Sequence, residues 1–310
     1  AVIGSLLGGF RLAKDLETNS LHIRTREILL NRYSALAGVL TMFIVSSTFW
    51  FSAISGDHGL TFFGPMGRDH IFHLALIERL QWHVPPDNFL VAGIPFTAYH
   101  FLSDLTHVLL RFVTFDHLDT FDVYFRYYPS FVYFCLGFLG FWIGTKLSAA
   151  FVGGWLCVIL VVLGADFSWV MGVLQVIVNI TDPAVALNRF FEPWIHWSSF
   201  GSTLPLVHRP AFYHGLLLLL AGVAFLINWK LTKKAWVGAG LFWGFSAGFN
   251  FTFAAIVGLA ITGSIIVSWV SQKKLETQRL FLCALAMVIG SLPANLFILS
   301  NLVQSDKTSF

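Results

Sequence analysis

The feature that most constrains the fold of this chain is a series of apolar runs that are almost free of charge. Each is close to the roughly 20 residues that an α-helix needs to cross the hydrocarbon core of a bilayer. Charged residues make up 11% of the chain, under half the roughly 25% of a soluble domain, which excludes a water-soluble globule. We therefore expect an all-α, polytopic membrane protein with about seven transmembrane helices, at about 36–54, 127–145, 149–165, 211–229, 235–251, 252–270 and 278–300.

Clusters of Lys and Arg predict how these helices are oriented. One cluster precedes the first run, and the others lie at Lys146, at 230–234 and at 273–279. Because basic loops stay in the cytoplasm, residues 1–310 are predicted to form a single transmembrane domain of the cytoplasmic (inner) membrane, with a cytoplasmic N-terminus. The net charge of +3 is too small to suggest nucleic acid as a partner, and membrane lipids are the partners expected.

This orientation gives the domain three polar parts and one tight turn. The chain would have a cytoplasmic N-terminal segment, 1–35, and two outer loops, 55–126 and 166–210. The segment 235–270 becomes a hairpin of two short spans that turns near Gly248 and Asn250, because basic residues flank it on both sides.

Two juxtamembrane helices are predicted in the first outer loop. Residues 70–83 are too short to span and are expected to lie along the membrane surface with an apolar side. Asp69 precedes them, either as a helix N-cap or as a reactive carboxylate at the outer surface. The second helix, 98–114, carries one polar stripe at helical spacing: His100, Ser103, Asp104, His107, Arg111 and Thr114. His100, Asp104 and His107 are either metal ligands or a hydrogen-bonded stripe that orients nearby loops.

Three segments in this order carry a resemblance to a known family. They are GRDHIFHLALIERL at 67–80, VPPDNFLVAGIPFTAYHFLSDL at 84–105 and the Arg126-led RYYPSFVYFCLGFLGFWIG at 126–144. The chain resembles the GT-C superfamily of integral membrane glycosyltransferases, and its PPDN…AG…YH stretch looks closest to uncharacterised prokaryotic members. The resemblance implies a GT-C-like fold and sugar transfer, hexosyl or pentosyl, from a polyprenyl-phosphate donor at the outer face.

The resemblance also implies roles for particular residues. Asp69 would be the catalytic base, and His70 stands where members often have a second acid. Asp57, at the outer end of the first span, is the rival carboxylate. Members commonly add a soluble C-terminal domain, which is absent or truncated in a chain that stops at Phe310.

The chemistry of such a transfer suggests further candidates. Negative charge grows on the departing phosphate, so cationic side chains are needed near it, and Arg209, His208 and Arg189 of the second outer loop are candidates. Trp194 and Trp197 are either interfacial anchors or a stacking surface for the sugar. His100, Asp104 and His107 are candidate substrate-binding residues, and a divalent cation such as Mg²⁺ or Mn²⁺ is the cofactor to test, although nothing in the sequence selects a metal.

Two other classes of function stay open at this point. A transporter or channel for a small solute or lipid would place ionisable residues inside the spans, and the predicted spans are almost free of charge. A non-catalytic membrane subunit could bind haem through His100 and His107. Flux through liposomes would identify the transporter, and a Soret band would identify the haem protein.

Overall fold

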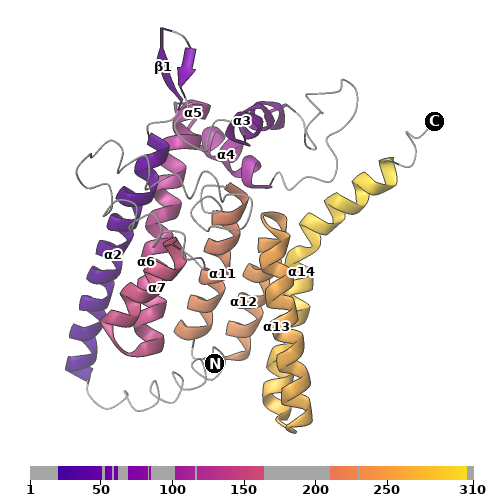
Figure 1. The fold of residues 1–310 in the computed structure, drawn as a ribbon. Coiled ribbons are helices and arrows are strands. Elements are labelled where there is room, and N and C mark those ends of the chain that lie inside the picture. The colour runs from indigo at the N-terminus through magenta and orange to yellow at the C-terminus, as the bar shows by residue number, and fades with distance from the viewer. Residues whose placement is uncertain are drawn as a thin grey trace, which may run out of the picture. The chain divides into compact units, whose positions relative to one another are not determined.

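The computed structural model describes residues 20–50, 53–57, 59–61, 69–82, 84, 102–115, 117–163, 210–229 and 231–305. Within these ranges the chain is mostly helical (Figure 1). The described residues include four helical segments that are long and apolar enough to cross a membrane, as expected for a membrane protein: Glu27–Ser46, Thr120–Ser148, Thr252–Val270 and Lys274–Pro293.

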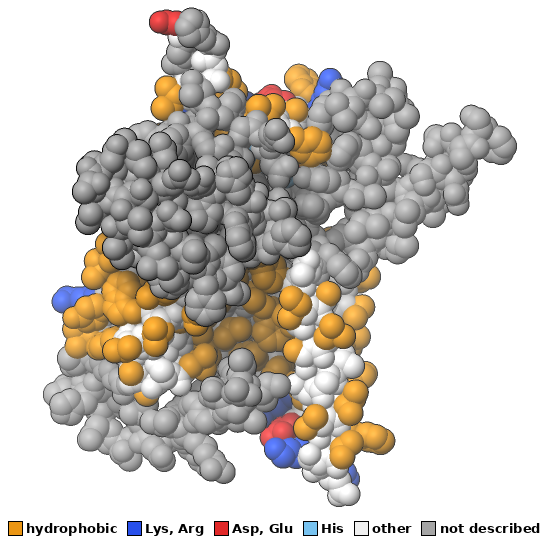
Figure 2. Space-filling model, viewed as in Figure 1, with side chains coloured by type: hydrophobic (Ala, Val, Ile, Leu, Met, Phe, Trp, Pro, Cys, Tyr) orange, Lys and Arg blue, Asp and Glu red, His pale blue; other side chains and the backbone are white. Residues whose placement is uncertain are grey.

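The outward surfaces of these helices fit a lipid environment. Large apolar side chains are exposed along them, including Phe43 at 65%, Leu259 at 75% and Val267 at 65% exposure. Figure 2 shows such side chains over the helices on the face that it presents. Water would not stabilise so much exposed apolar surface, whereas lipid does.

The other three predicted spans correspond to helices with shorter apolar stretches. They are α7 (Phe151–Leu163), α11 (Pro210–Asn228) and α12 (Lys233–Phe245). The count of seven crossings therefore stays a prediction, as does the GT-C-like arrangement.

The chain divides into two compact units, of which the first comprises Ala1–Arg68 and Pro129–Arg209. Its described elements are α2 (Ser20–Trp50), β1 (Ile54–Gly56), β2 (Gly59–Thr61), α6 (Tyr128–Ser148, from Pro129 onward) and α7. Small residues let α2 and α6 approach closely, as is common for membrane helices. A Cβ added at Gly38 would lie 2.8 Å from the carbonyl oxygen of Phe134.

The two ends of this helix pair are joined by polar contacts. Trp50 Nε1 donates to Ser130 Oγ over 3.0 Å, and Lys146 pairs with Glu27. Because the early residues of α2 meet the late residues of α6, the two helices run antiparallel, as Figure 1 shows.

Helix α2 and the apolar run predicted for the first span, at about 36–54, do not share the same ends. Helix α2 begins at Ser20, within the segment assigned to the cytoplasmic loop, because hydropathy marks only the apolar part of a helix and Arg and Glu are good helix formers. It ends at Trp50 and not at residue 54. Ala53 has a φ of 56°, a left-handed conformation that no helix continues through, and it leads into the β1–β2 hairpin.

The second unit comprises Asp69–Tyr128 and Pro210–Phe310. Its described elements are α3 (Asp69–Leu80), α4 (Leu102–Val113), α5 (Thr120–Asp122), the π-helix η2 (Val123–Tyr127), α11, α12, the 3₁₀-helix η3 (Ser246–Gly248), α13 (Phe251–Val270) and α14 (Lys274–Ser305). Side chains cap several of these helices. Asn250 accepts a hydrogen bond from the Thr252 amide over 3.0 Å and so starts α13. The turn predicted near Gly248 and Asn250 lies there.

Helices α12 and α14 form the tightest contact of this unit. A Cβ added at Gly240 would collide with the carbonyl of Cys283, and one at Gly244 with the carbonyl of Met287. Both positions advance by four residues, so the two helices run parallel. Together with α11 and α13 they form an apolar core of Leu226, Ala235, Ala239, Trp243, Ile261 and Cys283.

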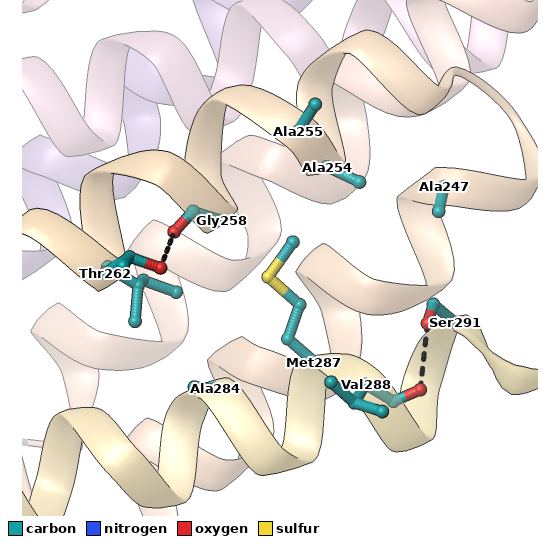
Figure 3. Close-up of a pocket in the computed structure, with 10 residues that line it drawn as sticks. Ala247, Ala254, Ala255, Gly258, Thr262, Ala284, Met287, Val288 and Ser291 are labelled. Carbon is teal, nitrogen blue, oxygen red and sulfur yellow. Dashed lines mark hydrogen bonds between the residues drawn. The ribbon is translucent and has the colours of Figure 1, made fainter.

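A groove of about 270 Å³ lies between α13 and α14 (Figure 3). Its walls are mostly small side chains, together with Ile261, Met287 and Val288. Its hydroxyl groups bond within their own helices. Thr262 donates to Gly258 O and Ser291 to Val288 O, each over 2.8 Å. The groove therefore presents an almost wholly apolar surface.

Candidate functional site

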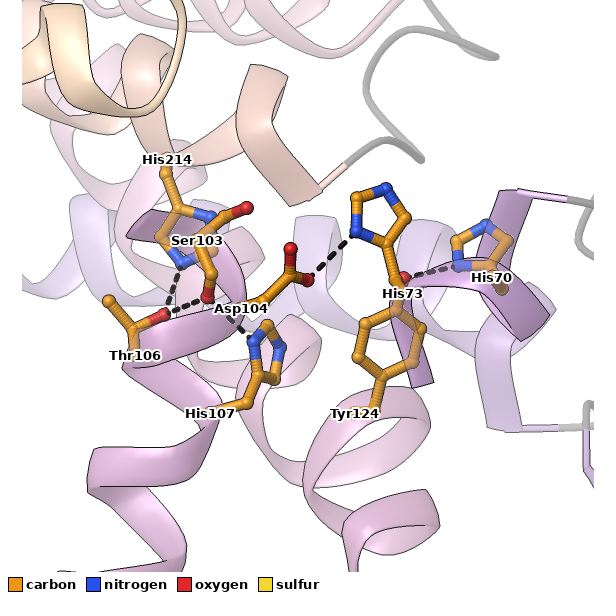
Figure 4. Close-up of polar contacts among 8 residues, drawn as sticks. All are labelled: His70, His73, Ser103, Asp104, Thr106, His107, Tyr124 and His214. Atoms are coloured by element: carbon orange, nitrogen blue, oxygen red, sulfur yellow. Dashed lines mark hydrogen bonds and ion pairs between the residues drawn. The ribbon is translucent and has the colours of Figure 1, made fainter. Parts of the chain in front are cut away.

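The candidate site of the second unit begins where α3 packs on α4. Leu76 and Leu80 of α3 are buried against Leu105 and Val108 of α4. His73 lies one turn before Leu76 on the same face of α3, and Asp104 lies one turn before Val108 on α4. The packing therefore brings His73 Nδ1 to 2.8 Å from Asp104 Oδ1 (Figure 4).

This packing changes the interpretation of the first juxtamembrane helix. The helix was predicted to lie along the membrane surface with a broad apolar side. Part of that side packs inside the protein, since Leu76 and Ile77 are 0% exposed and Leu80 is 3% exposed. Ile71, at 50% exposure, remains on the outside.

Burial shifts the pKa of Asp104, which is paired with His73. Asp104 is fully buried, on a helix outside the candidate spans, and loss of hydration raises its pKa above the ordinary 3.8. The hydrogen bond and the charge of His73 lower that pKa by less. Burial therefore favours the protonated carboxyl of Asp104 over the carboxylate.

His107 is held neutral one turn further along α4. Its Nδ1 lies 2.8 Å from the carbonyl oxygen of Ser103, which can only accept, so Nδ1 carries the proton. Complete burial lowers its pKa well below 6.5, and the neighbouring His214 lowers it further. In the neutral ring, Nε2 therefore presents a lone pair.

Two tyrosines from the next helical segment enclose these groups. Tyr124 lies in the π-helix η2, whose wider turn changes the direction of the side chains that follow, and such turns are frequent at functional sites. Its hydroxyl lies 2.8 Å from His70 Nδ1. The ring of His107 lies between Tyr124 and Tyr128, with centroid distances of 5.0 and 4.7 Å.

Helix α11 completes the cluster with His214. Its Nε2 hydrogen-bonds the hydroxyl of Tyr128 and lies 3.2 Å from Thr106 Oγ1. The ring also stacks on Phe249, 5.0 Å away between centroids. Segments distant in sequence thus converge on what we call the histidine cluster, defined by His70, His73, Asp104, His107, Tyr124, Tyr128 and His214.

Three buried polar atoms of α4 lack a hydrogen-bond partner within the described part of the chain. They are Ser103 Oγ, Asp104 Oδ2 and His107 Nε2. Leaving such a group unsatisfied costs about 1–3 kcal/mol, so sites of this kind commonly hold water or a ligand group. The cluster can therefore receive hydrogen-bond donors as well as exchange protons.

A second network ties the far ends of the same helices together. Arg111 of α4 donates to Thr120 Oγ1 over 2.6 Å and to Glu78 Oε1 over 3.3 Å, and the Thr120 hydroxyl donates to the same Glu78 oxygen. This network fixes α3, α4 and the start of α5 relative to one another, which stabilises the geometry of the cluster.

The structure brings together some of the residues predicted for the site. His70, Asp104 and His107 belong to the histidine cluster, and Asp69 is the first residue of α3, although its side chain lies outside the described residues. Asp57 belongs to the first unit, in the exposed turn between β1 and β2. The other candidates lie outside the described residues: His100, Arg189, Trp194, Trp197, His208 and Arg209.

The described residues contain no group of three or more His, Cys, Asp and Glu side chains arranged to hold a metal ion. Asp104 and His107 share a helix face, as predicted, but Asp104 bonds His73 and His107 bonds the backbone of Ser103. These contacts are closer to the alternative prediction, a hydrogen-bonded stripe. The residue that hydrogen-bonds Asp104 is His73, which lies on α3 and not on the same helix.

Sequence reasoning did not assign His73, Tyr124, Tyr128 and His214 to the site. His70 and His73 share a helix face by their spacing of three, which was a usable signal. His214 lies inside the apolar run 211–229, and an ionisable residue in such a run is itself a signal. The tyrosines gave none, because aromatic residues are abundant throughout the chain.

Comparison of the chain with family models, with curated proteins and with solved structures finds no match.

Proposed function

We propose that this protein is a membrane glycosyltransferase, which transfers a sugar from a polyprenyl-phosphate donor to an acceptor at the outer face of the cytoplasmic membrane, with Asp69 as the catalytic base. The order of elements carries this proposal. A long apolar helix, α2, is followed by a short helix that begins at Asp69, by a second short helix, α4, and by the helical segment that contains Arg126. The GT-C resemblance implies this order.

The position of Asp69 suits a base. The first turn of a helix favours negative charge, because backbone N–H groups there are unpaired and the helix dipole is positive. An ionised carboxylate is the form that accepts a proton from an attacking hydroxyl.

The hydrogen bonds of the histidine cluster hold in place the helix that begins at Asp69. His70 bonds Tyr124, and His73 bonds Asp104, so the first turn of α3 is attached at two adjacent points on one face. A catalytic group on a rigid, hydrogen-bonded element keeps its geometry better than one on a loop. On this proposal His70 and His73 are positioning residues, and the proton moves to Asp69.

The test is sugar transfer by purified protein supplied with radiolabelled polyprenyl-phosphate hexoses and pentoses. Asp69→Asn should lower the rate by about 10²- to 10⁴-fold, the usual contribution of a general base, with unchanged thermal unfolding. Asp57→Asn is the matched control and should keep the wild-type rate. Full activity of Asp69→Asn would remove Asp69 from the base role, and folded wild-type protein that uses none of these donors would refute the proposed function.

A further inference from the structure

Three helix ends meet at the basic end of the second unit. Helix α12 begins at Lys233, α13 ends at Val270 and α14 begins at Lys274. A cavity of about 660 Å³ lies among them, lined by Lys233, Trp269, Gln272, Lys274, Thr277, Gln278, Phe281 and Leu282. Figure 2 shows Lys and Arg side chains at the lower end of these helices, beneath a surface of mostly apolar and uncharged groups.

The charges around this cavity are almost all positive. Five basic residues lie within 231–282, and the one acidic residue of that stretch is Glu276. Glu276 pairs with Lys273 over 3.4 Å, and neither residue lines the cavity. The cavity itself thus has two lysines, Lys233 and Lys274, and no acidic group among its lining residues. Its potential favours an anion.

The backbone adds to this potential. Helices α12 and α14 run parallel, so the positive ends of both helix dipoles lie at this end of the unit, together with the one negative end of α13. Helix N-termini of this kind bind phosphate groups readily. Thr232 caps α12 by accepting a hydrogen bond from the Ala235 amide, and the Lys274 amide at the start of α14 donates to the carbonyl of Gln272, so the backbone contributes mainly through the two helix dipoles.

Two buried donors one turn deeper also lack an acceptor. Trp236 Nε1 and Arg279 Nε have no hydrogen-bond partner among the described residues. Trp236 lies one turn before Gly240 and Arg279 one turn before Cys283, the two residues in contact between α12 and α14. Arg279 therefore brings a fifth positive charge close to this end of the unit.

The apolar side of the cavity favours an anion that also has an apolar part. Trp269 is 72% exposed and Phe281 62% exposed, at the level where two candidate spans, Thr252–Val270 and Lys274–Pro293, end and begin. Exposed Trp at such a level is typical of the membrane–water interface. A polar, cationic rim beside an apolar wall matches an amphiphile better than a free ion.

We propose that this cavity binds the headgroup of an anionic phospholipid from the adjacent leaflet. Lys233 and Lys274 contact the phosphate oxygens, Gln272 and Gln278 donate hydrogen bonds to the headgroup, and the acyl chains follow Phe281 and Leu282 along α14. The proposal is independent of sugar transfer, because it uses a different end of the second unit from the histidine cluster.

The test is lipid binding by delipidated protein, measured by native mass spectrometry with phosphatidylglycerol, phosphatidylcholine or inorganic phosphate. The double variant Lys233→Gln/Lys274→Gln should bind phosphatidylglycerol about thirtyfold more weakly, given the contribution of two lysines near an anionic lipid. The control Arg32→Gln/Lys146→Gln removes the same charge from the first unit and should bind within about twofold of wild type. Thermal unfolding of both variants verifies that they are folded.

Three results would overturn the proposal. The first is unchanged phosphatidylglycerol affinity in folded Lys233→Gln/Lys274→Gln. The second is phosphatidylcholine binding as tight as phosphatidylglycerol binding, which would mean that net negative charge is not recognised. The third is inorganic phosphate that displaces phosphatidylglycerol at equal concentration, which would identify a site for a free anion and not for a lipid.

Discussion

Replacing Asp104 with Asn tests whether the buried carboxyl of the histidine cluster is uncharged. Asn has nearly the same shape and its Oδ1 can still accept a hydrogen bond from His73 Nδ1. It cannot ionise, so it removes the one titration that burial has shifted at this position. Asp104→Ala removes the hydrogen bond as well, and we expect it to be less stable than Asp104→Asn by about 1–3 kcal/mol at every pH.

The sign of the pH effect follows from the raised pKa of Asp104. The unfolded chain releases this proton near pH 3.8, whereas the folded protein keeps it to a higher pH. The stabilisation is therefore complete below the unfolded pKa and is lost as the pH rises through the folded pKa. Between the two values, the free energy of unfolding of the wild type falls by about 1.4 kcal/mol per pH unit relative to Asp104→Asn.

The assay is thermal unfolding in detergent, followed by tryptophan fluorescence, for wild type and Asp104→Asn over a pH series from about 4 to 8. Titrating groups that do not interact with Asp104 contribute equally to both proteins, so the difference between the curves reports Asp104 together with its contact to His73. The stability of Asp104→Asn relative to wild type should rise with pH and then level off. If it falls with pH, the charged pair with His73 outweighs burial and our reasoning about the cluster is wrong.

Two further substitutions, each with a control, test one helix contact and one hydrogen bond of the second unit. Gly244→Ala should lower the free energy of unfolding by about 1–3 kcal/mol in thermal or denaturant unfolding, because its Cβ would meet the Met287 carbonyl. The control Gly263→Ala, with nothing within 4 Å of the added Cβ, should be neutral or slightly stabilising. Equal effects of the two substitutions would contradict the close α12–α14 contact. Tyr124→Phe should cost about 1 kcal/mol in the same assay by removing the bond to His70. Tyr33→Phe, on an exposed ring, should have no effect, and a neutral Tyr124→Phe would mean that this bond does not hold α3.

Much of the helical pattern was predictable because it depends on local sequence. Apolar runs of sufficient length form helices, and Asn250 marks the start of α13 through its own side-chain cap. The short helix after Asp69 was also predictable, since its length and composition favour a helix that Val84 and the following prolines cannot continue. The start of α2 was missed because charged residues can extend a helix beyond its apolar part.

The polar pairing of the site was not predictable, because it depends on contacts between distant residues. Asp104 was placed in one polar stripe with His100 and His107, either as metal ligands or as a hydrogen-bonded stripe that orients nearby loops. The sequence did not show that it bonds His73, which is 31 residues away. The orientation of Tyr124 depends on the π-helical turn of η2, for which the sequence offers no recognisable pattern. The burial of Leu76 and Leu80 of α3 against α4 also depends on residues distant in sequence.

Sugar transfer in sealed vesicles of known orientation tests the central claim most directly. Wild-type protein in right-side-out vesicles, supplied with a polyprenyl-phosphate sugar and an acceptor that cannot cross the bilayer, should form product, and Asp69→Asn in the same vesicles should form at least about 100-fold less. Inside-out vesicles should be inactive until they are permeabilised. Product formed only in sealed inside-out vesicles, or at the same rate by Asp69→Asn, would contradict a reaction at the outer face that depends on this carboxylate.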